Sequence, residues 1–126
     1  MSSISTTHRV AVYGTLKCGL ANHGLLRHAR YLGETLLHDI TLYDLGWFPG
    51  AKLESSGGIL AEVYGVDEST LAILDHLEGF RPGDPERSLF LRHPVETPLG
   101  EAWVYIYNHP VDEFEPMRSG SWWPDH

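Results

Sequence analysis

The chain has 126 residues, of which 42% are hydrophobic, and it carries a formal net charge of −8. This length suits one domain with a single core, and the apolar content excludes a disordered or fibrous chain. Lysine and arginine total only nine and form no cluster, so a nucleic-acid backbone is not the expected partner. We expect a single domain over residues 1–126.

The chain carries no sign of export or membrane insertion. Its one cysteine, Cys18, cannot form an internal disulfide. Residues 1–8 lack the apolar stretch of a secretory signal and are expected to form a loose lead-in. No apolar run approaches the roughly 20 residues of a membrane helix. A cytoplasmic monomer that does not associate with membranes is the default expectation.

Short segments of alternating or apolar residues, separated by turn formers, predict about seven strands. They cover residues 9–13, 31–37, 40–45, 51–53, 59–66, 88–95 and 101–107. Both faces of the last segment are apolar or amphipathic, which indicates a central strand. Residues 21–30 could form one or two helical turns, and residues 81–87, with two prolines, are expected to form a loop.

Residues 66–80 are the one strongly patterned helix. Asp67 or Ser69 can cap it, and Gly79 can end it in a left-handed conformation. The leucines at 71, 74 and 77 recur at helical spacing and predict one packed face. With several short strands around this helix, the sequence predicts a mixed α+β domain with a curled or closed sheet.

Glu78 occupies an unusual place on this helix. At about 100° per residue it projects between Leu71 and Leu74, at the margin of the apolar stripe. Its carboxylate is either turned out to water or held in a partly dry place, where its pKa would rise. The helix alone leaves both interpretations open.

Two further features are candidates for a site. The first strand runs into Gly14, Thr15 and Leu16, a bend whose free N–H groups can form a nest for an anion or a carbonyl oxygen. It lacks the P-loop pattern. Arg92 lies in an apolar strand, where it either faces outward on an edge or pairs with a site carboxylate.

The other reactive residues give weaker indications of a functional site. Cys18 is expected to be a packed or idle thiol, because no base is placed beside it by the sequence. The eight histidines form neither H-x-H nor H-E-x-x-H, so no metal and no cofactor are expected, and G-x-S-x-G is absent. Aromatic residues near two turns could line a pocket or pack a core; these are Trp47, Phe48, Trp122 and Trp123.

Taken together, these segments resemble the γ-glutamylcyclotransferase-like (AIG2-like) family over about residues 9–123. The matching stretches are VYGTL at 12–16, YDLG at 43–46 with PG at 49–50, residues 58–66, LDHLEGF at 74–80, Arg92, and AWVYIY at 102–107. The sequence departs from the family in two places. Phe90 stands where a tyrosine is usual, and the ending SGSW at 119–122 only approximates the family's.

The resemblance implies a small mixed β-barrel of six or seven short strands with one or two flanking helices. It implies an enzyme that converts a γ-glutamyl amide into 5-oxoproline and a free amine, without a cofactor. Glu78 would be the general acid/base, and the γ-glutamyl substrate would be bound by Tyr13, Gly14, Thr15, Leu16 and Arg92. The alternative is a non-catalytic module that keeps the pocket and binds a small metabolite or a protein.

Overall fold

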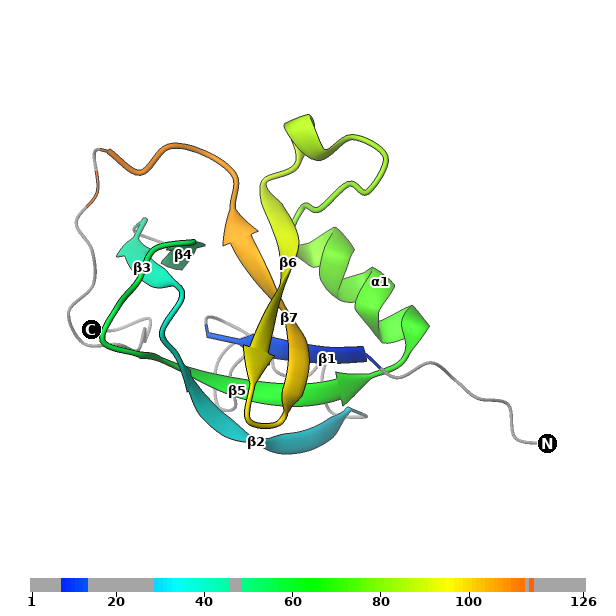
Figure 1. Ribbon diagram of the computed structural model, residues 1–126. Helices are drawn as coiled ribbons and strands as arrows, with labels where there is room; N and C mark the ends of the chain where they lie inside the picture. The colour runs from blue at the N-terminus through cyan, green and yellow to red at the C-terminus, as the bar shows by residue number, and fades with distance from the viewer. Residues whose placement is uncertain (1–7, 14–28, 46–48, 113, 115–126) are drawn as a thin grey trace.

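The computed structural model describes residues 8–13, 29–45, 49–112 and 114 (Figure 1). Within these residues it contains seven strands, one α-helix and one short 3₁₀ helix. In chain order they are β1 (His8–Val12), β2 (Arg30–Leu37), β3 (Thr41–Asp44), β4 (Pro49–Lys52), β5 (Ile59–Val66), α1 (Glu68–Leu77), η2 (Pro85–Arg87), β6 (Phe90–Thr97) and β7 (Gly100–Tyr107).

Five strands form one sheet in the order β2-β5-β1-β7-β6, and β3 pairs with β4 in a second, two-stranded sheet. The pair β1–β7 is parallel and the other pairs are antiparallel, so the larger sheet is mixed. In Figure 1 the sheet curls strongly, and α1 lies beside the β6–β7 hairpin. The α+β class is confirmed. The barrel is not closed, because β2 and β6 remain the outer strands of the sheet as described.

The two faces of the larger sheet bury two separate cores, as the period of two along a strand requires. In β1, Ala11 faces one core, whereas Val10 and Val12 face the other. The first core includes Leu42 from β3 and Ala51 from β4. The second lies against α1 and contains Val10, Val12, Tyr64, Val66, Leu71, Leu74, Phe90 and Tyr105.

Most strand predictions are confirmed, with ends that move by a residue or two. Residues 59–66 form β5 as predicted, and β7 lies between β1 and β6, which confirms its interior position. The expected loop at 81–87 contains η2. Of the expected helical turns at 21–30, residues 21–28 lie outside the described part, and Arg30 begins β2 instead.

The helix α1 forms for the reasons its sequence suggests. The side chain of Asp67 caps it by accepting a hydrogen bond from the N–H of Thr70 at 2.8 Å. Leu71 and Leu74 are buried, but Leu77 is 39% exposed, so the prediction that it shares their packed face is wrong. The buried face is centred on Leu71 and Leu74, and Leu77 is turned about 60° beyond Leu74. No helix in the described residues is long and apolar enough to cross a membrane.

Candidate active site

The candidate site lies where the carboxyl end of α1 approaches the ends of β1 and β7. These two parallel strands are bridged at a single position, Val10 with Trp103. At the end of β1 the strands are joined through a side chain: the hydroxyl of Tyr13 donates to the main-chain carbonyl of Tyr105. The same hydroxyl accepts a hydrogen bond from the N–H of Ala51, in β4, at 3.3 Å. Tyr13 therefore ties three strands together while remaining buried.

Glu78 is the residue that ends α1. Its N–H still bonds to the carbonyl of Leu74 at 2.9 Å, and the chain then turns at Gly79, whose φ is +69°. Only glycine adopts this conformation without a steric cost. The carbonyl of Gly79 accepts from the N–H of Leu89 at 2.9 Å, which fixes the exit of the helix against the start of β6. This local geometry holds the backbone of Glu78 in one place.

The side chain of Glu78 is shielded from water, and this raises the pKa of its carboxyl group. Desolvation by burial raises its pKa from 4.5 to about 7. Burial also raises the pKa of Tyr13 and that of Tyr105, and in both cases the charge of Glu78 raises it further. Glu78 at the end of α1, Tyr13 directly after β1 and Tyr105 in β7 therefore lie within electrostatic reach of one another. Of the two interpretations of Glu78, the structure supports the partly dry one.

A second carboxylate, Asp75, sits beside this group and was not singled out from the sequence. The hydroxyl of Tyr105 donates to Asp75 Oδ1 at 2.7 Å. Arg92 Nε lies 3.1 Å from the same oxygen, as an ion pair whose side chains are only 12% and 18% exposed. The sequence did contain an indication of this residue. Asp75 lies four residues after Leu71 and three before Glu78, a spacing that places it on the buried face of the helix.

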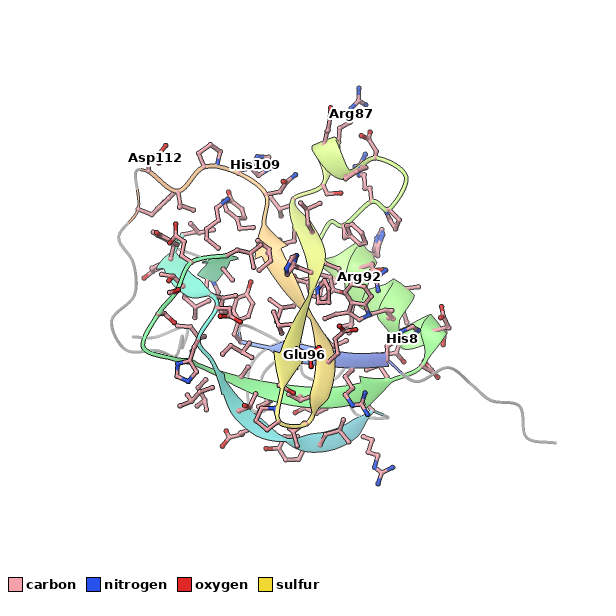
Figure 2. The ribbon with its side chains drawn as sticks, in the orientation of Figure 1. His8, Arg87, Arg92, Glu96, His109 and Asp112 are labelled. Atoms are coloured by element: carbon pink, nitrogen blue, oxygen red, sulfur yellow. The ribbon has the colours of Figure 1, made fainter. Side chains whose placement is uncertain are left out.

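Arg92 is held on three sides. Its guanidinium carbon lies 4.6 Å from the ring centroid of Trp103 and 5.2 Å from that of Phe80, distances typical of cation–π contacts. Figure 2 shows its side chain between β6 and α1. Arg92 is therefore in an ion pair with a buried carboxylate, although its strand β6 is an outer one. The partner is Asp75.

The described structure thus brings together Glu78 and Tyr13, and it links them through Tyr105 and Asp75 to Arg92. Gly14, Thr15 and Leu16 lie outside the described residues, as do Cys18 and the aromatic residues Trp47, Phe48, Trp122 and Trp123. Phe90 is buried in the core against α1, with its ring 5.4 Å from that of Tyr107. Among the described residues, no three His, Cys, Asp or Glu side chains are grouped as metal ligands.

Comparisons with known proteins agree with the fold and with the resemblance. The family model described as gamma-glutamyl cyclotransferase, AIG2-like, matches residues 10–124. The Escherichia coli K12 gamma-glutamylcyclotransferase family protein YtfP is 39% identical over 114 residues, which cover 90% of this chain and 95% of that protein. The solution structure of E. coli ytfP superposes with a TM-score of 0.71 at 37% identity, covering 90% of this chain and 95% of the other.

A relative with a more specific name is the gamma-L-glutamyl-butirosin B gamma-glutamyl cyclotransferase of Niallia circulans. It is 36% identical over 119 residues, covering 88% of this chain and 72% of that protein. The chain belongs to the AIG2-like γ-glutamylcyclotransferase family.

Proposed function

We propose that this protein is a γ-glutamylcyclotransferase that releases an amine from a γ-glutamyl amide by intramolecular cyclisation. The observation that carries the proposal is Glu78, whose backbone is held at the end of α1 and whose carboxyl has a pKa raised by desolvation to about 7. Family membership supports the reaction class. A base whose pKa lies near neutral pH exchanges protons with an amine more efficiently than an ordinary glutamate does.

In the proposed reaction Glu78 acts as general base and then as general acid. Its carboxylate takes a proton from the α-ammonium of the substrate, and the freed nitrogen attacks the side-chain amide carbon. A C–N bond forms to close the five-membered ring, and the original amide C–N bond breaks. The ring nitrogen loses a second proton. Through Glu78 the two protons pass, one after the other, to the leaving nitrogen, so 5-oxoproline and a free amine, in its protonated form, result.

The reaction needs no nucleophile from the protein, because the attacking nitrogen belongs to the substrate. The protein has to hold the substrate in a ring-closing geometry and exclude water, and orientation alone supplies several kcal/mol of barrier lowering. We propose that the N–H groups of Gly14, Thr15 and Leu16 bind the α-carboxylate or the developing oxyanion. The position of Tyr13, immediately before this segment and within reach of the charge of Glu78, supports that placement.

In this proposal Arg92 does not bind the substrate directly, as the resemblance implied, but pairs with a neighbouring carboxylate. Its guanidinium is paired with Asp75 and stacked between two aromatic rings. These contacts support a role in which Arg92 neutralises the buried Asp75, the acceptor of the Tyr105 hydroxyl.

The γ-glutamyl end of the substrate follows from the reaction, whereas the amine half is open. The Niallia circulans relative is named for the γ-glutamyl compound γ-L-glutamyl-butirosin B. We therefore include γ-glutamyl-protected natural products among the candidate substrates, beside glutathione, γ-glutamyl amino acids and γ-glutamyl-lysine isopeptides.

The proposal is tested by measuring 5-oxoproline by mass spectrometry after incubation with these four classes of compound. Wild type should form product with at least one class, and Glu78→Gln should form almost none while still binding the substrate. Glu68→Gln is the matched control, because Glu68 lies on the same helix with its side chain 73% exposed. Substrate binding without any 5-oxoproline from well-folded wild type would favour the alternative, a non-catalytic binding module.

A further inference from the structure

The two phenols that the charge of Glu78 reaches, Tyr13 and Tyr105, both use their only O–H elsewhere. Tyr13 donates to the carbonyl oxygen of Tyr105, and Tyr105 donates to Asp75 Oδ1 at 2.7 Å. A phenol has a single donor hydrogen. Neither phenol can therefore donate to Glu78 while these hydrogen bonds are formed, although the charge of Glu78 reaches both.

Asp75 is built into the structure as the acceptor that holds the Tyr105 hydroxyl. Its side chain is 12% exposed on the buried face of α1, where a charge without a partner would be costly. Arg92 supplies the opposite charge at 3.1 Å from the same Oδ1 that accepts from Tyr105. Because Arg92 is itself fixed between Phe80 and Trp103, the position of this acceptor is fixed as well.

We propose that Asp75 is a positioning residue that keeps the O–H of Tyr105 turned away from Glu78. This inference deepens the proposed function and rests on it. A hydrogen bond donated to a carboxylate stabilises its charged form and makes it a weaker base. Glu78 follows Asp75 by three residues, a spacing that makes two side chains neighbours on a helix. By holding the hydroxyl hydrogen of Tyr105, Asp75 leaves Glu78 a stronger base toward the substrate ammonium and a carboxylic acid available at neutral pH.

Other charged and titratable groups on the strands are held by partners of their own. Arg92 on β6 is held by Asp75, and the ammonium of Lys52 on β4 donates to the carbonyl of Tyr107 at 2.9 Å. On β5, the hydroxyl of Tyr64 donates to the buried Glu62 at 3.1 Å. Together with Tyr13, which follows β1, and Tyr105 on β7, these are the groups whose charges the test has to separate from that of Asp75.

The test is a carboxyl titration by ¹³C NMR of the full chain labelled in glutamate, without substrate, with the Glu78 resonance assigned by its loss in Glu78→Gln. Asp75→Leu removes the acceptor, so the Tyr105 hydroxyl becomes free to donate to Glu78. We expect the midpoint of Glu78 to fall by about one pH unit or more. Asp75→Asn keeps the shape and a weaker acceptor, so it should shift the midpoint less, in the same direction; it also serves if Asp75→Leu fails to fold.

The double variant Asp75→Leu/Tyr105→Phe separates the phenol from the charges. It lacks the hydroxyl, so the midpoint should return toward that of wild type, and Tyr105→Phe alone should leave the midpoint high. An unchanged midpoint in Asp75→Leu would overturn the proposal. An equal fall in the single and double variants would also overturn it, because the unpaired Arg92 would then be the cause.

These outcomes are independent of turnover, so they are distinguishable from failure of the proposed function. If the chain is a catalyst, the acidic limb of its kcat/KM profile should move to lower pH in Asp75→Leu by the same amount as the NMR midpoint. A protein that forms no 5-oxoproline but shows the expected titrations would contradict the reaction and leave the positioning role standing.

Discussion

The hydroxyl of Tyr13 donates its hydrogen to the main-chain carbonyl of Tyr105, across the ends of the parallel strands β1 and β7. The same oxygen accepts from the N–H of Ala51 in the second sheet. The Tyr13 hydroxyl thus bonds to two main-chain groups, a carbonyl and an N–H. It does so near the ends of β1 and β7, whose one bridge, at Val10 and Trp103, lies earlier in β1. It also places a phenol within reach of the charge of Glu78, which raises the pKa of Tyr13 beyond the effect of burial.

Tyr13→Phe should destabilise the fold, because it leaves a buried carbonyl and a buried N–H without their partner. We expect a loss of about 1–3 kcal/mol in the free energy of unfolding, measured by urea denaturation. Tyr43→Phe is the control, since its hydroxyl bonds to Glu54 at 2.6 Å on the surface and should matter little. Equal effects at the two positions would contradict the role assigned to Tyr13.

The raised pKa of Glu78 predicts how stability depends on pH. The folded chain binds its proton up to about pH 7, whereas the unfolded chain loses it near 4.5. Between these values the folded state holds more protons, so this group's contribution to stability falls as the pH rises. Glu78→Gln should therefore match wild type below pH 4.5 and exceed it by up to about 3 kcal/mol above pH 7. A constant difference across that range, measured by denaturation, would contradict the shift.

The ion pair of Asp75 and Arg92 should show strong coupling in a double-mutant cycle. Arg92→Met alone leaves a buried carboxylate unpaired and should cost about 3 kcal/mol or more. Asp75→Asn with Arg92→Met removes both charges and should cost less than the sum of the single changes. Additive losses in urea unfolding would mean that the two residues do not stabilise one another.

Gly79→Ala should destabilise the end of α1. The position has a φ of +69°, and an added Cβ would lie 3.0 Å from Cβ of Leu89. The conformational cost alone is roughly 1–2 kcal/mol. Gly83→Ala is the matched control, because nothing lies within 4 Å of its added Cβ and its φ is not positive. Unfolding of both variants by denaturant checks the difference.

Local patterns were sufficient to predict most elements of this fold. Alternation of apolar residues predicted β5 at its observed bounds, and a cap at Asp67 with a glycine at 79 predicted the limits of α1 to within about two residues. The parallel pairing of β1 with β7 and the separation of β3 and β4 into their own sheet were not predictable in this way. They depend on which strands pack together, and a single sequence does not carry that information locally.

The candidate site was predictable where it depends on helix geometry. The angular position of Glu78 between Leu71 and Leu74 predicted that it borders the core, and the same reasoning applied to Asp75 would have placed it there too. The partner of Arg92 and the hydrogen bonds of Tyr105 were not predictable, because residues 75, 92 and 105 come together only through the tertiary fold.

The measurement that tests this account most directly is the formation of 5-oxoproline by wild type, Glu68→Gln and Glu78→Gln on a panel of γ-glutamyl compounds. The account predicts product from wild type and Glu68→Gln at similar rates, and almost none from Glu78→Gln although that variant is folded and binds substrate. A Glu78→Gln protein with the turnover of wild type would contradict it.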